Sequence, residues 1–563
     1  MSRILLRKAK QLAADPTLLR FLVERALGRV ARPAAFTPGH PPYLASLALE
    51  APPEFRSFIE TMPGEPCRPL TLPLPGATVT LEPGRAEALF AMEFTDLETR
   101  LAVHRFAWLP LTDAEPAWVT ALWRAWAERF AIPDTGWAWH PYTAAERAIN
   151  ILDFARRHGL PGPAAATLAL LAAHGPAIAS RLEYGGEHYT GNHLANDGRG
   201  LYLLGLELGW EGCAALGRDI LLNEAERIFL PTGMLREGSS HYQLLLGRGY
   251  LSAWLAARRH HRPEAATLAG IARRALGAAQ RLALPGGLPL IGDVSPDCPP
   301  RFLACLLPGG DLGTGWGARL DDDDRAAVRA LRDGAAPEGG EDGWLRAEFG
   351  EWTGLWYAAP AGWPVMPGHG HQDLGACEIH WRGVPLVIDP GRGGYGESGA
   401  AALYRSAAVH STLQLDGGDP TPPNRPYYDD AFRARSGGAA PRLERLADGV
   451  RLTHHGFRRH GGREVERRWT FTQDGLETND AVQGIGAPRI SRRLVTPWPV
   501  RMEGGAALVH TPAGSLRVHA DAPLSLTTLT RWTAYGEGQP AMAITADCGS
   551  LLPWRGRLSV EVV

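Results

Sequence analysis

The spacing of apolar residues changes once along this 563-residue chain, and that change limits the folds available to it. Between Glu115 and about Leu331, apolar residues recur every three or four positions, as in YTAAERAINILDFARRHGL, which predicts roughly eight to ten helices. After a glycine-rich, acidic linker at 334–343, segments such as GVRLTHHGF alternate with a period of two and predict antiparallel strands. Helices followed by strands indicate two segregated domains, with the chemistry expected in the cleft between them.

The chain length supports the same division, because single hydrophobic cores stop growing at about 250–300 residues. We expect an amphipathic helical segment at 1–36, an all-helical domain at 37–335 and an antiparallel β-sandwich at 344–563. Successive antiparallel helices form bundles, solenoids or closed toroids, and the absence of a fixed repeat disfavours a regular solenoid.

The N-terminal segment mixes leucines with basic residues. Arg7, Lys8 and Lys10 interrupt the apolar run that a signal peptide needs. No apolar stretch of the chain reaches the roughly 20 residues of a membrane-spanning helix. The segment therefore predicts an amphipathic helix, packed on the protein body or, as the alternative, lying on a membrane surface. We therefore expect a cytoplasmic protein.

Composition and cysteine spacing exclude several classes of protein. The formal net charge of −2 argues against a dedicated nucleic-acid binder. Nearly all positive charges are Arg, which fits either an anion-binding site or a compositional bias. The cysteines are far apart and form no CxxC pair, so neither a disulfide framework nor a cysteine zinc site is expected; they are Cys67, Cys213, Cys298, Cys305, Cys377 and Cys548.

Two polar clusters open predicted helices in the helical half. Asn192 and His193 begin NHLANDGRGLYLLG, and Tyr242 follows Glu237 in EGSSHYQ. Such clusters also arise from helix capping, because Asn and Ser side chains satisfy the free N–H groups of a first turn. A lone Tyr is more often a packing residue, so these clusters alone leave both interpretations open.

A histidine-rich stretch, GHGHQDLGACEIHWRGVPLVIDPG, opens the β-rich half and is followed by YRSAAVHSTLQLDG. Adjacent strands could bring His371, Asp389 and His410 together, and two imidazoles with one carboxylate suit tetrahedral Zn²⁺. His369 and His371 would share one face of a strict strand, but a bend at Gly370 could give one to the metal and one to substrate. The alternative is a pair of surface histidines.

These motifs, in this order, resemble the successive signatures of the heparinase II/III-like family. WAWHPYTAAERAIN and IGDVSPD also resemble stretches of its helical domain, so the likeness covers about 105–505. The resemblance implies an N-terminal (α/α) toroid followed by an antiparallel β-sandwich, and lyase activity on an acidic, uronate-containing polysaccharide or oligosaccharide. A homodimer is compatible with it.

The resemblance also implies roles for particular residues. Asn192 would hold the uronate carboxylate with His193 beside it, Tyr242 would act as acid or base, and His369 would be the second proton-transfer residue. β-Elimination removes the C5 proton and expels the oxygen at C4. Histidine, with a pKa near ~6.5, suits the base, and tyrosine, near ~10, suits the acid, or the base if nearby cations lower its pKa.

The same resemblance assigns His371, Asp389 and His410 to one divalent ion, best fitted by Zn²⁺. We expect this ion to be structural, because elimination needs no metal-activated water. Gln243 stands where members often carry His, and Thr496 where some members have His, which weakens transfer of any particular substrate.

Substrate contacts are expected from Arg147, Glu237 and Trp139. Arg147 could instead pair with Glu146 on its own helix.

Two other functions fit the same fold. A glycoside hydrolase would need two opposed carboxylates, for which Glu237, Asp197, Asp293 and Asp297 are available. A glycan-binding or assembly protein could keep the fold without turnover.

Overall fold

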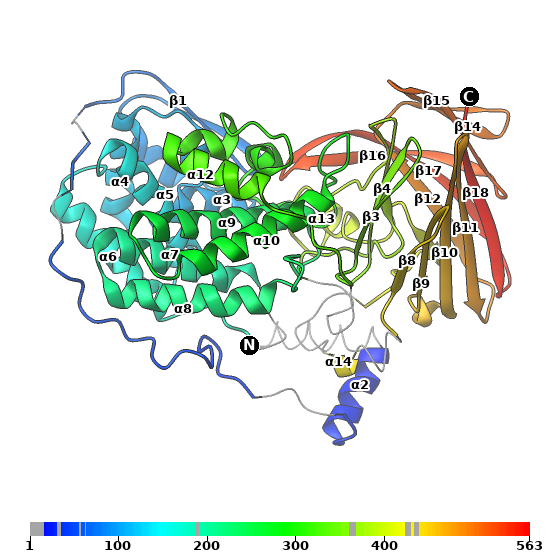
Figure 1. The fold of residues 1–563 in the computed structure, drawn as a ribbon, viewed down its shortest axis with the longest axis horizontal. Helices are drawn as coiled ribbons and strands as arrows, with labels where there is room; N and C mark the ends of the chain where they lie inside the picture. The colour runs from blue at the N-terminus through cyan, green and yellow to red at the C-terminus, as the bar shows by residue number, and fades with distance from the viewer. Residues whose placement is uncertain are drawn as a thin grey trace.

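The computed structural model describes residues 16–30, 35–55, 58–61, 64–186, 191–359, 368–422, 430–432 and 439–563. Helices fill one part of the molecule and antiparallel sheets the other, side by side (Figure 1). The last helix of the helical part ends at Asp333, and the first strand of the sheet-rich part begins at Trp344. This order confirms the predicted fold class.

The helical part is a double layer. The inner helices contact one another in chain order, α3 with α5, α5 with α7 and α7 with α9, while α6, α8 and α10 pack outside them. The inner helices are α3 (Leu97–Arg105), α5 (Pro141–His158), α7 (Asn192–Leu208), α9 (Ser240–Arg259) and the short α11 (Pro300–Leu303). The outer helices are α4 (Pro116–Phe130), α6 (Ala164–Ala179), α8 (Glu211–Ile228), α10 (Ala265–Leu282) and α12 (Asp322–Asp333).

Glycines allow the inner helices to be enclosed on all sides. A Cβ on Gly200 of α7 would lie 2.6 Å from the Cβ of Ala145 on α5, and one on Gly205 would lie 2.2 Å from the backbone nitrogen of Ala214 on α8. These close contacts bury α7 almost completely. Its N-terminus, which carries Asn192, is thereby held rigidly. Among the described helices, none combines the length and apolar composition of a membrane-spanning segment.

The N-terminal segment is described only in part, because 1–15 and 31–34 lie outside the described residues. Helix α2 (Pro16–Ala26) packs Leu18 and Phe21 against Phe432, with the two phenyl rings edge to face at 5.1 Å. Phe432 belongs to the short α14 (Asp430–Phe432). Within the described part of the chain, α2 therefore packs against α14 through the side that carries Leu18 and Phe21.

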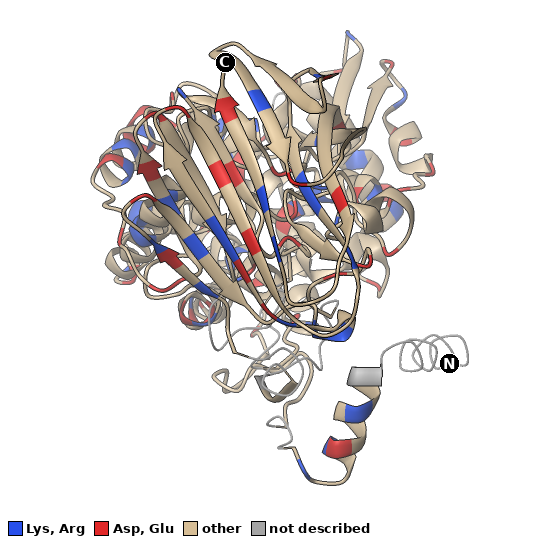
Figure 2. Cartoon of the chain, turned by 90° about the vertical axis from the view of Figure 1, so that its right-hand side faces the viewer, with Lys and Arg blue, Asp and Glu red and all other residues tan. Residues whose placement is uncertain are grey.

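The sheet-rich part consists of three antiparallel sheets, with strand orders β3-β4-β5-β6, β16-β17-β12-β7 and β13-β14-β15-β18-β11-β10-β9-β8. Along β10 buried and more exposed residues alternate. Figure 2 shows charged residues of both signs placed along the strands of the largest sheet. The strands are β3 (Trp344–Phe349), β4 (Trp352–Tyr357), β5 (Cys377–Trp381), β6 (Val384–Val387), β7 (Leu413–Leu415), β8 (Arg442–Arg445), β9 (Gly449–His454), β10 (Gly462–Thr472), β11 (Gly475–Gly484), β12 (Arg489–Thr496), β13 (Val500–Glu503), β14 (Ala506–Thr511), β15 (Gly514–Ala520), β16 (Leu524–Ala534), β17 (Glu537–Gly549) and β18 (Trp554–Val562). A separate hairpin, β1 (Leu70–Leu74) with β2 (Ala77–Leu81), belongs to the helical part.

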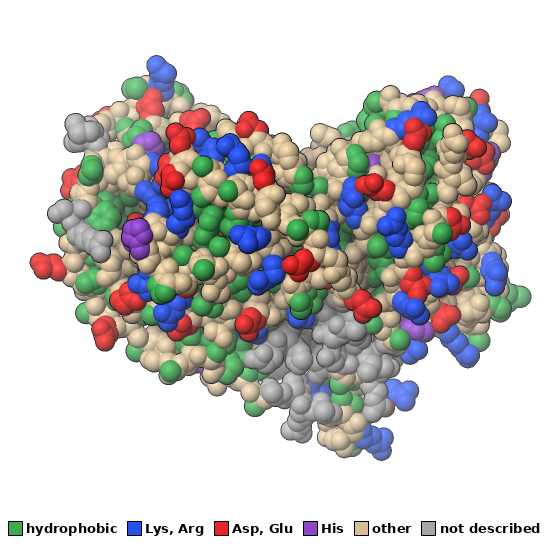
Figure 3. Space-filling model, in the orientation of Figure 1, with side chains coloured by type: hydrophobic (Ala, Val, Ile, Leu, Met, Phe, Trp, Pro, Cys, Tyr) green, Lys and Arg blue, Asp and Glu red, His purple; other side chains and the backbone are tan. Residues whose placement is uncertain are grey.

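The two parts, which appear as two lobes in Figure 3, are joined by apolar and polar contacts. An apolar cluster combines Met234 and Leu282 of the helical part with Trp344 and Leu355 of the first sheet. The turn between β16 and β17 reaches the helical part, where the hydroxyl of Tyr535 donates a hydrogen bond to Asp96 at 3.1 Å. The junction is therefore a packed interface.

Candidate active site

The backbone of His369 forms hydrogen bonds between the two parts of the chain. Its backbone N–H donates to the carbonyl of Glu237 at 3.0 Å, and its carbonyl accepts from the N–H of Asp293 at 2.9 Å. Both partners lie in loops of the helical part. Gly292 has φ +78° and approaches so closely that a Cβ would lie 2.8 Å from the His369 carbonyl oxygen. The backbone itself therefore holds His369 in place.

Two predicted catalytic side chains converge on the His369 imidazole. The Nδ2 of Asn192 lies 3.0 Å from Nε2, and the ring of Tyr242 stacks on the imidazole with centroids 3.7 Å apart. Asn192 begins α7, Tyr242 lies in the first turn of α9, and His369 precedes β5. The structure thus brings together three of the four predicted catalytic residues.

The hydrogen bonds around His369 define its tautomer. Nδ1 lies 3.1 Å from a carboxylate oxygen of Asp293, which can only accept, so Nδ1 carries the proton. Burial favours the neutral acid, but hydrogen bonds from His369 and His371 and the charge of Arg392 outweigh it and hold the pKa of Asp293 well below its usual range. Nε2 is then unprotonated and accepts from Asn192. An Asp–His pair of this kind is suited to a general base.

The Tyr242 hydroxyl keeps its proton near neutrality. Burial raises the pKa of its hydroxyl well above the ordinary value. The hydroxyl lies 2.6 Å from that of Tyr395, whose own pKa burial also raises. Tyr395 stands in the glycine-rich turn after β6, and its hydroxyl lies 3.4 Å from the carbonyl of Val294. Both phenols are therefore protonated near neutrality, a state that suits a proton donor better than a base.

The His193 side chain faces Glu183, a residue that the sequence motifs did not indicate. Its Nδ1 lies 2.8 Å from a carboxylate oxygen of Glu183, which also lies 3.6 Å from Nε2 of His140. Burial opposes the charged form, but Glu183 raises the pKa of His193 above its usual value. The side chain is nearly half exposed, so the imidazole, whose charged form Glu183 favours, faces the solvent beside Asn192.

Glu237 lies at the site but does not face an open subsite as expected. Its carboxylate accepts from the backbone N–H of Asn192 at 2.9 Å and from Nδ2 at 3.2 and 3.3 Å. With 3% of its surface exposed, it orients Asn192 instead of meeting substrate.

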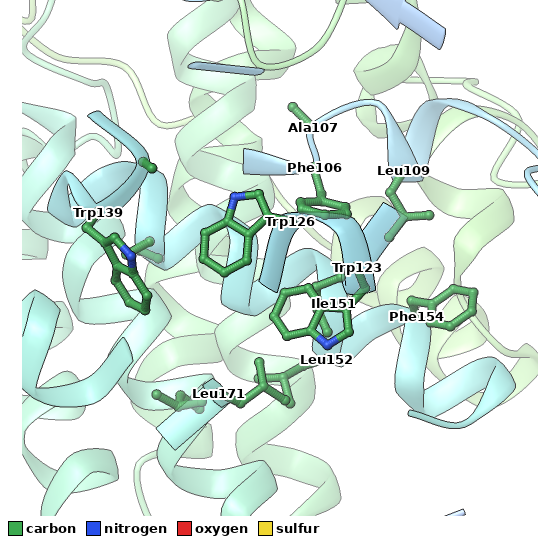
Figure 4. Close-up of a cluster of buried hydrophobic side chains, with 14 of the residues drawn as sticks. Phe106, Ala107, Leu109, Trp123, Trp126, Trp139, Ile151, Leu152, Phe154 and Leu171 are labelled. Carbon is green, nitrogen blue, oxygen red and sulfur yellow. The ribbon is translucent and has the colours of Figure 1, made fainter. Parts of the chain in front are cut away.

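The prediction that Arg147 and Trp139 bind substrate is wrong. Both are buried in the core of the helical part, whose aromatic residues Trp126 and Trp139 are seen in Figure 4. The Arg147 guanidinium lies 4.0 Å from the ring centroid of Trp126 and 4.9 Å from that of Trp139. Arg147 donates to the carbonyl of Ala138 at 2.6 Å, and Trp139 Nε1 to that of Phe130 at 2.7 Å.

The alternative partner of Arg147 is also wrong, because Glu146 pairs with Arg199 of α7 at 2.8 Å. Helix α5 is buried on most of its circumference, so residues beside each other in sequence enter different parts of the core.

A cavity of about 550 Å³ lies at the junction of the two parts, within the size range of small-ligand sites. Asp297 and Arg301 line it from the helical part, and Tyr535 and Glu537 from the β16–β17 turn. Asp297 also accepts a hydrogen bond of 2.5 Å from Tyr142, whose ring lies 4.6 Å from that of His193. The cavity therefore adjoins the cluster around His193.

The three residues expected to bind metal do come together. One possible ligand atom from each of His371, Asp389 and His410 lies within 4.8 Å of the others, and all three side chains are buried. Within the described residues, Nδ1 of His371 and Nε2 of His410 have no hydrogen-bond partner. Buried unpaired imidazole nitrogens are costly, and a bound cation would satisfy both. Nε2 of His371 contacts Asp293 at 2.9 Å, an outer contact typical of metal-binding histidines. The residues therefore fit one Zn²⁺.

The carboxylates that a hydrolase would use are engaged elsewhere. Asp293 contacts two histidines, Glu237 holds Asn192, and Asp297 pairs with Arg105 at 2.9 Å. Asp197 is fully buried, and burial raises its pKa well above the ordinary value. None of the four is arranged as one of two opposed carboxylates flanking an open subsite, which weakens the hydrolase alternative.

The double layer of helices, the antiparallel sheets and the Asn, Tyr and His side chains at their junction define the chain as a two-domain protein of the toroid and sandwich class. Residues 331–542 match the family model described as "Heparinase II/III-like, C-terminal". The match supports the resemblance seen in the motifs of this part of the chain, from the histidine-rich stretch onward. No curated protein sequence matches the chain.

Solved structures extend the likeness to both domains. A crystal structure of heparinase III is 15% identical, with a TM-score of 0.60 over 82% of this chain and 76% of that one. A heparinase III gene product is 16% identical, with a TM-score of 0.57 over 85% and 81%. The heparan sulfate lyase HepC from Pedobacter heparinus is 16% identical, with a TM-score of 0.51 over 86% and 79%. At these identities the likeness establishes the fold, an (α/α) toroid followed by a β-sandwich.

Proposed function

We propose that this protein is a polysaccharide lyase that cleaves an acidic, uronate-containing glycan by β-elimination. The proposal is carried by the contact of Asn192 with His369 beneath the Tyr242 ring, which joins a carboxylate-binding amide, a base and an acid across the domain junction. The similar solved structures include heparinase III and a heparan sulfate lyase, which supports a substrate of this class.

In the first step a proton leaves C5 of the uronate. Asn192 donates from Nδ2 to the uronate carboxylate, and the His193 imidazolium adds positive charge beside it. Together they stabilise the negative charge that builds on the carboxylate as the C–H bond breaks. Nε2 of His369 accepts the proton, and the Asp293 carboxylate stabilises the imidazolium that forms.

In the second step the bond from C4 to the leaving oxygen breaks. The Tyr242 hydroxyl gives its proton to that oxygen, leaving a double bond between C4 and C5. Tyr395 can donate to the Tyr242 oxygen at 2.6 Å, which limits the charge on the resulting phenolate. Proton exchange with solvent then restores Tyr242 and His369.

The reaction type is tested by the products from a panel of heparan sulfate, hyaluronan, alginate and bacterial capsules. We expect oligosaccharides that absorb in the ultraviolet through the new double bond, formed in ¹⁸O-water without uptake of label. Labelled oxygen at a new reducing end would instead show hydrolysis. No cleavage of any acidic glycan, with intact binding, would favour the non-catalytic alternative.

The charge of His193 gives a test of its role. Because Glu183 raises the pKa of His193, the imidazolium is lost only as the pH rises above the ordinary histidine range. The E183Q substitution removes that carboxylate, so the alkaline limb of the kcat/KM profile should move to lower pH. Of the other groups near His193, Arg105 opposes the charged form and Glu237 favours it, and both stay in place in E183Q.

The matched control is E207Q, which removes the carboxylate 3.5 Å from His260 at the other end of α7. Its pH profile should match the unaltered protein. An unshifted profile in E183Q would show that the charge of His193 is not used.

We also propose that His371, Asp389 and His410 hold one structural Zn²⁺. When bound, the ion would tie together the loop before β5, the end of β6 and the start of β7, and so fix His371 against Asp293. Elemental analysis of protein purified without an affinity tag should find one zinc per chain. H410A should lose the metal and lower the melting temperature, because metal binding is coupled to folding. H519A, at an exposed histidine, should do neither. Metal-free protein of unchanged stability would refute the site.

A further inference from the structure

Helix α2 presents an apolar stripe to solvent on the side away from its attachment. Leu18 and Phe21 face Phe432 and are buried. The stripe repeats every four residues and continues one residue past the helix end; it comprises Leu19, Val23 and Leu27, which are 46, 49 and 62% exposed. In Figure 1, α2 lies below both domains, apart from their packed interior. Helix α2 therefore has two apolar sides. One is buried against Phe432, and the other, the stripe, is largely exposed.

The segment that carries this stripe is strongly basic. Residues 1–36 contain eight Lys and Arg against two Asp and Glu, within a chain whose formal net charge is −2. Both lysines of the chain, Lys8 and Lys10, stand here. Positive charge is thus concentrated in the same segment as the exposed apolar side chains.

We infer that the α2 stripe binds the surface of an anionic lipid bilayer. Apolar side chains on one side of a short helix, within a cationic segment, are the features of helices that lie in the headgroup region. Anionic lipids attract such segments, and attraction falls with salt because of screening. A stable protein interface buries about 800 Å² on each partner and requires a complementary surface, which three side chains do not supply. A bilayer needs no such complementarity.

This inference does not depend on the lyase proposal. If both hold, the protein cuts its glycan beside a membrane, with the cleft tethered through α2 and Phe432.

The test is sedimentation of the full chain with vesicles of phosphatidylcholine, alone or mixed with phosphatidylglycerol. We expect binding to the mixed vesicles only, weakening as NaCl is raised. Replacing the stripe (L19Q, V23Q and L27Q together) should weaken binding by at least about tenfold, because the apolar contact is lost. The control replaces three exposed apolar residues elsewhere, I132Q, I485Q and L551Q, and should bind normally.

Several results would overturn the inference. These are no binding, equal binding to both kinds of vesicle, or unchanged binding of the stripe variant. A dimer of the unaltered protein that the stripe variant cannot form, seen by analytical ultracentrifugation without vesicles, would assign the stripe to a second copy instead. Melting temperatures show whether the variants fold. The comparison of vesicle compositions uses the unaltered protein and so does not depend on them.

Discussion

The Y242F variant is expected to lose about 10²–10⁴-fold in kcat on the true substrate while keeping its fold and most of its substrate affinity. The substitution removes one hydroxyl and leaves the ring stacked on His369, 3.7 Å away. The lost group is the acid that protonates the leaving oxygen. Initial rates from ultraviolet absorbance, with KM and melting temperature, measure the effect.

Two further variants sharpen this result. H369A should lose a similar factor, and the double variant much less than the product of the two, because acid and base act as a unit in the same reaction. Y250F is the control, since Tyr250 is a buried tyrosine of the same helix whose hydroxyl donates to the Leu221 carbonyl at 2.8 Å. Near-normal turnover in Y242F would make Tyr242 a packing residue.

A second large effect is expected from D293N, on the order of 10³–10⁴-fold in kcat, the range seen where an Asp orients a catalytic histidine. Asp293 accepts from Nδ1 of His369, which leaves Nε2 free as the base. An amide Nδ2 in its place would donate to Nδ1 and move the proton to Nε2, where it blocks proton abstraction. The substrate still meets Asn192, so KM should change far less than kcat.

Because Asp293 also contacts His371, zinc content must be measured in the same preparation. The control is D480N, which removes the partner of Arg467, 2.7 Å away inside the sandwich, and should lower stability without a comparable fall in kcat. A D293N protein that keeps its metal and its turnover would exclude His369 as an Asp-assisted base.

The sequence predicted those features that depend on local pattern. The change of period from helical to alternating gave the order of the two domains. The motif order suggested that Tyr242 and His369 act together, although they belong to different domains. Pairings over long distances have no local signal: β7 pairs with β12, Leu413 opposite Arg492, across strands that pair among themselves.

The errors and omissions at the site have a physical origin. Arg147 lies on a helix buried on most sides, so periodicity could not tell the face toward substrate from the face toward Trp126. Glu183 and Tyr395 lie in loops, where no period indicates direction. Asp293 was noted only as one of several carboxylates, because its contact with His369 depends on how two distant loops meet.

The backbone clamp on His369 also affects when the protein becomes active. The helical domain, which contains Asn192 and Tyr242, is synthesised first. His369, the proposed base, belongs to the later part of the chain. The backbone groups of Glu237 and Asp293 can form their hydrogen bonds with His369 only once that part has left the ribosome and docked on the helical domain. In the proposed mechanism, a chain that ends before His369 has Tyr242 as the acid but no base, so we expect it not to cleave glycan until the sandwich is complete.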